Sequence, residues 1–179
     1  WQDMQTAVYD RSLATIQFNT NIGDAKITGL EVDWTLFTEN GYTIILGGSL
    51  TNPKLNDNFV LNGNLLANSG TQLANVAKRK MSLSVNKGFT ILNGREGSWD
   101  FNVSTTGKRK SSITNPVNQG AYTIVGFSST LQGEDWDAVF YVDNLLDKRA
   151  VIWEYQGYRP ETKFTNRPKE IGLRLKYKF

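Results

Sequence analysis

The chain has 179 residues, 39% of them hydrophobic, and a formal net charge of +3 at pH 7. It contains neither His nor Cys, which excludes a Ser-His-Asp triad, an imidazole zinc site, a thiolate nucleophile and a disulfide framework. No run reaches the roughly 18 apolar residues of a membrane-spanning helix, although this test does not detect the strands of a β-barrel. For catalysis this leaves only carboxylates, Lys, Tyr and hydroxyl groups, and we expect no catalytic residues, no metal site and no cofactor. The chain begins at Trp1 with neither Met nor a signal peptide, which favours a processed chain or a fragment.

Alternation of apolar and polar residues predicts eight strands, because successive side chains point to opposite faces of a strand. The first strand is truncated, and the facing of the sixth is ambiguous. In chain order they are 1–9, 29–36, 42–51, 81–89, 99–104, 122–131, 136–143 and 168–179. The last is the clearest, because its apolar residues alternate with Arg174, Lys176 and Lys178. A soluble antiparallel sheet and a membrane wall both give this pattern.

The connections between these strands alternate in length. Short turns are expected at 38–41, 91–97 and 132–135. Long segments are expected at 10–23, 56–76, 109–121 and 146–167. Short turns at one end and long loops at the other are typical of an outer-membrane β-barrel, whereas a β-sandwich rarely sorts its loops by length.

Seven aromatic residues lie near the short-turn end of these strands and share the parity of the apolar residues. They are Trp34, Tyr42, Phe89, Trp99, Trp136, Tyr177 and Phe179. Aromatic residues gathered at one end of an outward face indicate a membrane-interface girdle. The alternative is a set of aromatic residues that closes one end of a sandwich core.

Four segments are similar to motifs of one protein family. Residues 1–5 (WQDMQ) resemble a W-x-D-I-Q strand, and residues 21–32, with NIGDA and GLEV, resemble N-x-G-x-A followed by G-x-E. Residues 142–149 (VDNLLDKR) resemble V-x-N-L-F-D-K-x-Y, and residues 167–179, with RPKEIG and a final YKF, resemble an R-P-R-x-x-G ending. Taken in this order, the segments resemble the C-terminal barrel portion of TonB-dependent outer-membrane receptors. The chain departs from that pattern at Ala77, Leu146 and Ala150, where the family often has Pro, Phe and Tyr.

The resemblance implies an all-β fold, an antiparallel transmembrane β-barrel meander of about eight strands that are the last eight of a 22-stranded barrel. Residues 1–179 are then its C-terminal portion, without the plug domain and the earlier strands. The implied function is active uptake of a ferric siderophore, cobalamin or a carbohydrate across the bacterial outer membrane. The implied partners are membrane lipid and lipopolysaccharide, the plug and remaining strands, the energy-coupling TonB protein through the N-terminal part, the barrel-assembly machinery and a small-molecule ligand.

The last long loop contains residues that suit ligand contact at a receptor mouth, where exposed aromatic side chains and one Arg are typical. They are Trp153, Tyr155, Tyr158, Arg159 and Phe164. Packing of the loops on one another is an equal alternative. The sequence does not choose a ligand.

Two basic clusters are expected side by side at the outer rim, one at the start of a strand and one at the end of its neighbour. They comprise Lys78, Arg79 and Lys80, and Lys108, Arg109 and Lys110. Such cations can bind lipopolysaccharide phosphates or counter the charge of an anionic ligand, and an ordinary solvated rim is the alternative. We do not expect nucleic acid as a partner, because the sequence indicates no stacked aromatic residues between the two clusters.

The terminal strand, with Leu175, Tyr177 and Phe179, resembles the signal that the barrel-assembly machinery reads by strand addition. A plain final strand is the alternative. Glu31 and Asp33 share one strand face and are expected as charges of the barrel wall rather than as a glycosidase pair. Two rival functions stay open: a self-contained eight-stranded barrel and a soluble β-sandwich module that binds carbohydrate.

Overall fold

The computed structural model describes residues 2–9, 17–91, 94–154 and 162–179, and their regular structure is entirely β-strand. These residues form no helix long and apolar enough to cross a membrane. The strands are β1 (Gln5–Tyr9), β2 (Gln17–Asn21), β3 (Ala25–Phe37), β4 (Tyr42–Leu55), β5 (Phe59–Leu61), β6 (Asn64–Ala67), β7 (Arg79–Thr90), β8 (Glu96–Thr106), β9 (Arg109–Lys110), β10 (Asn118–Gln119), β11 (Tyr122–Gln132), β12 (Trp136–Asp143), β13 (Val151–Glu154), β14 (Lys163–Thr165) and β15 (Glu170–Tyr177).

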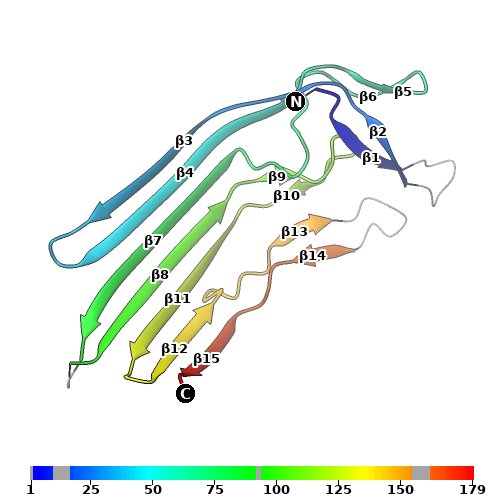
Figure 1. The fold of residues 1–179 in the computed structure, drawn as a ribbon. Helices are drawn as coiled ribbons and strands as arrows, with labels where there is room; N and C mark the ends of the chain where they lie inside the picture. Colours follow the sequence, from blue (N-terminus) through cyan, green and yellow to red (C-terminus); the bar gives the residue numbers. More distant parts are fainter. Residues whose placement is uncertain (1, 10–16, 92–93, 155–161) are drawn as a thin grey trace.

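Seven of these strands form one antiparallel sheet in the order β15-β12-β11-β8-β7-β4-β3 (Figure 1). The sheet confirms seven of the eight expected strands and their up-and-down connections. Tight turns join neighbours at one end, which we call the turn end. There, for example, Thr38 N–H donates to the Tyr42 carbonyl at 2.9 Å, and Gly41 adopts a positive φ of 77°. Within the described residues β3 and β15 are the free edges, so the sheet is open and is not the closed eight-stranded barrel of the rival interpretation.

The expected first strand takes a different place. Its residues form β1, which pairs with β2 in a separate hairpin, with Gln5 opposite Asn21. The Met4 backbone continues that pairing, because its N–H donates to the Gly23 carbonyl at 3.0 Å and its carbonyl accepts from Ile22 N–H at 2.8 Å. The alternation correctly indicated an extended segment. Its partner, however, lies within the segment 10–23 that we expected to be a long loop.

One face of the sheet is apolar across its full width. A single row of paired residues crosses all seven strands: Leu36, Ile44, Val85, Phe101, Phe127, Val142 and Ile171. Several large side chains of this apolar face are open to the surroundings, among them Leu30 at 63% exposure and Leu173 at 66%. A soluble sandwich would cover such a face with a second sheet, whereas a membrane wall leaves it to lipid.

The opposite face is polar. The adjacent row of paired residues contains Phe37, Thr43, Asn86, Asp100, Ser128, Tyr141 and Gly172. Within it the Asn86 amide donates to the Asp100 carboxylate at 2.8 Å. A wall with lipid on one side and an aqueous or protein-filled interior on the other requires this alternation.

Four small hairpins gather at the end of the sheet opposite the tight turns, which we call the loop end (Figure 1). They are β1–β2, β5–β6, β9–β10 and β13–β14. A hydrophobic cluster, the loop core, joins the loop-end tips of β3 and β4 to the connections that carry the first three hairpins; it is made of Ile22, Ala25, Leu55, Phe59, Ala67, Leu73 and Ile113. The buried centre of the described structure therefore lies among the long connections and not between layers of sheet.

Candidate functional site

A polar cluster holds the base of the last long loop where β12 ends. Asn144 has a positive φ of 50° and is only 4% exposed. Its amide nitrogen donates to the carbonyls of Lys148 at 3.0 Å and Arg167 at 2.9 Å, and its amide oxygen accepts from Lys148 N–H at 2.9 Å. Asn suits this position because it tolerates a left-handed backbone and offers both donors and an acceptor.

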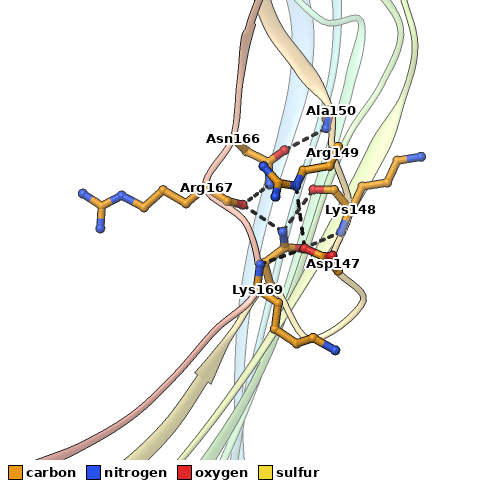
Figure 2. Close-up of polar contacts among 8 residues, drawn as sticks. Asp147, Lys148, Arg149, Ala150, Asn166, Arg167 and Lys169 are labelled. Atoms are coloured by element: carbon orange, nitrogen blue, oxygen red, sulfur yellow. Dashed lines mark hydrogen bonds and ion pairs between the residues drawn. The ribbon is translucent and has the colours of Figure 1, made fainter.

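The neighbouring residues extend this cluster, which we call the clasp, across to the chain that enters β15 (Figure 2). Asp147 accepts from Lys169 N–H at 2.9 Å and lies 3.7 Å from the Arg149 guanidinium. Asn166 accepts from Ala150 N–H at 2.7 Å through its side-chain oxygen. The clasp thus joins the two C-terminal motifs found in the sequence, residues 142–149 and 167–172, and orients the hairpin that emerges between them.

The hairpin β13–β14 carries two of the five expected ligand contacts. The rings of Trp153 and Phe164 meet edge to face, with centroids 5.2 Å apart and planes at 63°. Both side chains stay partly open, at 41% and 53% exposure. The other three expected contacts, Tyr155, Tyr158 and Arg159, lie outside the described residues. The structure therefore brings one aromatic pair together at the loop end.

The two basic clusters adjoin each other, as expected. Lys80 pairs with Thr106, and Gly107 N–H donates to the Arg79 carbonyl at 2.8 Å. Lys78, Arg79, Lys80 and Lys108 are exposed, whereas Lys110 is half-buried. Strand parity divides the first cluster, because Arg79 pairs with Leu50 on the apolar face and Lys80 pairs with Ser49 on the polar face.

Arg109 differs from the expectation of an exposed cation, since it is only 6% exposed. Its Nη2 donates to the carbonyls of Val151 and Ile152, each at 2.9 Å, and its guanidinium lies 5.3 Å from the Tyr122 ring centroid. Arg109 therefore ties β9–β10 to β13–β14 instead of facing solvent. No local pattern indicated this, because its acceptors lie more than forty residues away in the chain.

A groove lies on the polar face near the loop end, with a volume of about 360 Å³. Glu31, Asp33 and Lys80 supply its charges, and Ser49, Ser82 and Thr106 supply hydroxyl groups. The two carboxylates thus lie on the interior face, where we expected wall charges. Among the described residues, no group of three or more Asp and Glu side chains is placed to hold a metal ion.

The aromatic residues of the apolar face gather at the turn end, as the sequence predicted. Tyr42 and Trp99 meet edge to face at 6.0 Å, and Lys87 Nζ lies 4.3 Å from the Tyr42 ring centroid. On the edge strand, the rings of Tyr177 and Phe179 lie 5.2 Å apart. Leu175 shares their face and is 71% exposed. The residues of the expected assembly signal therefore line the apolar face of a free sheet edge.

Comparisons with known proteins agree with this architecture. The sequence matches the family model for the TonB dependent receptor-like β-barrel over residues 2–145. Among solved structures, the ferric yersiniabactin uptake receptor FyuA from Yersinia pestis is similar with a TM-score of 0.74 and 21% identity, covering 90% of this chain and 25% of that chain. The siderophore receptor PiuA from Acinetobacter baumannii has a TM-score of 0.66 and 16% identity, covering 88% and 22%. No curated protein sequence matched.

The chain thus spans about a quarter of the length of these two receptors, and at this identity the likeness shows a shared fold. The family and both structural neighbours are receptors and transporters rather than enzymes. Family membership also implies an outer-membrane protein. The match over residues 2–145, together with a sheet that is apolar outside and polar inside, shows that the chain belongs to the TonB-dependent receptor β-barrel family.

Proposed function

We propose that this chain forms part of the wall and mouth of an outer-membrane receptor that takes up a scarce nutrient, with a ferric siderophore as the favoured cargo. The observation that carries the proposal is the division of the sheet into an apolar and a polar face. The chain also belongs to a family of receptors. The cargo class is supported by two structural neighbours, one a ferric yersiniabactin uptake receptor and the other a siderophore receptor. Cobalamin and carbohydrate stay as alternative cargoes.

In this scheme the wall is passive and the loop end captures the cargo. The groove of Glu31, Asp33 and Lys80 opens on the polar face, where a plug domain would pack. The Trp153–Phe164 pair offers an apolar contact held on a hairpin that both the clasp and Arg109 orient. Energy coupling through a TonB protein and barrel assembly through the edge strand β15 belong to the same proposal.

Uptake of labelled iron tests the proposal in the bacterium that encodes the chain. Cells grown under iron limitation would be given ⁵⁵Fe-loaded siderophores of several classes, with cyanocobalamin and maltodextrin as alternative cargoes. Deletion of the gene should abolish uptake of one ferric siderophore, and Trp153→Ala with Phe164→Ala should weaken its binding about tenfold or more, because aromatic anchors dominate such contacts. If the deletion abolishes uptake of cobalamin or sugar instead, the assignment of a ferric siderophore as cargo is wrong. If the deletion leaves uptake of every cargo unchanged, the receptor proposal is wrong.

A matched control variant separates capture from folding. Val60 lies on another loop-end hairpin and is 53% exposed, like Phe164. Val60→Ala should leave uptake unchanged, because the proposal gives that side chain no contact with the cargo. All variants would be compared at equal receptor abundance in the outer membrane.

A further inference from the structure

The sheet places two lysines directly opposite each other. Lys26 on β3 pairs with Lys54 on β4 near the loop end, and both are exposed. Like charges in direct cross-strand contact are destabilising. The salt bridges found among the described residues are Arg149–Asp147 and Lys163–Glu154, so neither lysine has an acidic partner. The pair therefore lacks a compensating anion within the described chain.

The carboxylates closest to this pair in the sequence, those of Asp24 and Asp57, accept hydrogen bonds from the backbone. Asp24 accepts from Asp3 N–H at 3.2 Å, and Asp57 accepts from Asp24 N–H at 2.9 Å. These bonds hold the strand ends together at the loop core. Among the described residues, neither carboxylate forms a salt bridge with a lysine of the pair.

Strand parity puts this pair on the apolar face. Proceeding along β3 and β4 from Lys26–Lys54, the next paired row on that face is Thr28–Asn52, and the row after it is Leu30–Leu50. Arg79 of β7 pairs with Leu50 and adds a third cation beside that row. The outward surface thus changes from cationic, through neutral polar, to apolar within a few residues of strand.

A hollow lies at the neutral polar row, Thr28–Asn52, between the cationic row and the apolar row. It has a volume of about 460 Å³ and is lined by Thr28, Gly29, Leu50, Thr51, Asn52, Lys78 and Arg79. Leu30 and Met81, which follow toward the turn end, are 63% and 61% exposed. An occupant that fills the hollow therefore continues onto open apolar surface.

We propose that Lys26, Lys54 and Arg79 form a binding site for the phosphate groups of lipopolysaccharide in the outer leaflet. This inference rests on the proposed function in one respect, namely that the apolar face lies in the outer membrane. The order of the rows on β3 and β4 matches the order of groups in a glycolipid: phosphates at Lys26 and Lys54, sugar hydroxyls and amides at Thr28 and Asn52, and acyl chains along the apolar face. Arg79 lines the hollow together with Thr28 and Asn52 and offers a further cationic contact for a phosphate on the sugars. Free phosphate has no acyl chains, so the apolar face beyond Thr28 and Asn52 would not strengthen its binding.

The site differs from the one expected from the basic runs in the sequence. Of the six cations in those runs, Arg79 is placed on the apolar face beside the hollow, Lys80 faces the interior groove and Arg109 is buried. Lys26 and Lys54 are isolated in the sequence and meet only through strand pairing. The site is therefore defined by the pairing register of the strands and not by a run of basic residues in the sequence.

The test measures lipopolysaccharide retained by the protein extracted from outer membranes in mild detergent. Membrane fractionation comes first, so that absence from the outer membrane is recognised as failure of the proposed function. The triple variant K26Q/K54Q/R79Q should lower the affinity for lipopolysaccharide about 100-fold, at roughly fivefold for each cation near a membrane surface. The control R174Q/K176Q/K178Q removes the same charges from the polar side of β15 and from the residue that follows this strand, and it should retain the wild-type amount.

Two further measurements test the inference: one uses a charge-reversal variant and the other uses competing ligands. Lys26→Glu should lower retention, yet raise the midpoint of urea unfolding in lipopolysaccharide-free detergent, because it replaces a like-charge pair by an opposite-charge pair. Inorganic phosphate at millimolar concentration should not release the bound lipopolysaccharide, whereas excess purified lipid A should. Equal retention by the triple variant and its control, or full release by inorganic phosphate, would overturn the site.

Discussion

The sheet and the loop end of this molecule are stabilised in opposite ways. The sheet turns its largest apolar side chains outward, where Leu30, Leu173 and Leu175 are each more than 60% exposed. The loop end turns its apolar side chains inward, where Ile22, Leu55 and Phe59 are each at most 2% exposed. The arrangement of apolar side chains on the sheet therefore suits an apolar surrounding, and that of the loop end suits water. Strand pairing holds the sheet, whose apolar face lipid would cover under the proposed function, whereas burial from water holds the loops.

The difference predicts where a given substitution is harmful. In the loop end, size and fit of a buried side chain decide stability, as in a soluble protein. In the wall, the facing of a residue decides stability, because a charge on the lipid side is costly and a charge on the interior side is not. The substitutions below challenge this comparison, from the largest expected effect to the smallest.

Phe59→Ala should destabilise the loop end by about 4 kcal/mol, because truncating a buried aromatic side chain removes apolar burial and leaves a cavity. Limited proteolysis should cut the loop end faster, while the heat-dependent gel mobility of the sheet stays unchanged. Val60→Ala is the matched control. The Val60 side chain, next to Phe59 in the sequence, is 53% exposed and should tolerate the change. Loss of the sheet together with the loops would contradict the separation of the two regions.

Asn144→Gly should cost about 3 kcal/mol, at roughly 1 kcal/mol for each of the three hydrogen bonds that the buried Asn144 side chain makes with the backbone of Lys148 and Arg167. Gly keeps the positive φ of 50°, so the effect reports the side chain and not the backbone. Urea unfolding in phospholipid vesicles measures it. A Gly variant as stable as wild type would show that the clasp does not join the two regions.

Val85→Arg should destabilise the wall by about 2–4 kcal/mol, the range for Arg on the lipid side of a barrel strand. Ser84→Arg, one residue earlier and on the polar face, should cost less than about 1 kcal/mol by the same reasoning. Urea unfolding in vesicles compares the two variants. Equal costs would mean that the apolar face is not in lipid.

Lys87→Gln should give the smallest effect, about 0.5–1 kcal/mol, because its ammonium group lies 4.3 Å from the Tyr42 ring centroid at the turn end. The shift of the unfolding midpoint would be compared with that of Lys169→Gln, an exposed lysine away from the girdle. Identical shifts would remove the cation–π contact from the description of the girdle.

Much of the wall was predictable, because period-two alternation reports which residues are extended and which share a face. The ambiguous facing of 122–131 was resolved by register, since Phe127 lies between Phe101 and Val142 in the apolar row. The loop end was much less predictable. Its core unites residues such as Ile22, Phe59 and Ile113 from three different connections, and these residues follow no common period.

Two misplaced predictions have the same physical origin. Residues 1–9 show strand alternation, but alternation does not name the pairing partner, and hydrogen bonds to β2 took the place of hydrogen bonds to the sheet. Arg109 belongs to a run of cations that reads as a solvated rim. Its burial depends on the carbonyls of Val151 and Ile152, which only the fold brings within 2.9 Å.

The amino-acid sequence by itself determined the strand periods, the two faces of the wall, the girdle at the turn end and the family motifs, because each depends on neighbours within a few residues. Tertiary structure decided which cations are exposed, which loops share a core, how the motifs at 142–149 and 167–172 form the clasp, and that Lys26 meets Lys54. These features depend on register and on contacts between distant segments, where hydrogen-bond geometry and desolvation select one arrangement among many that the local pattern allows.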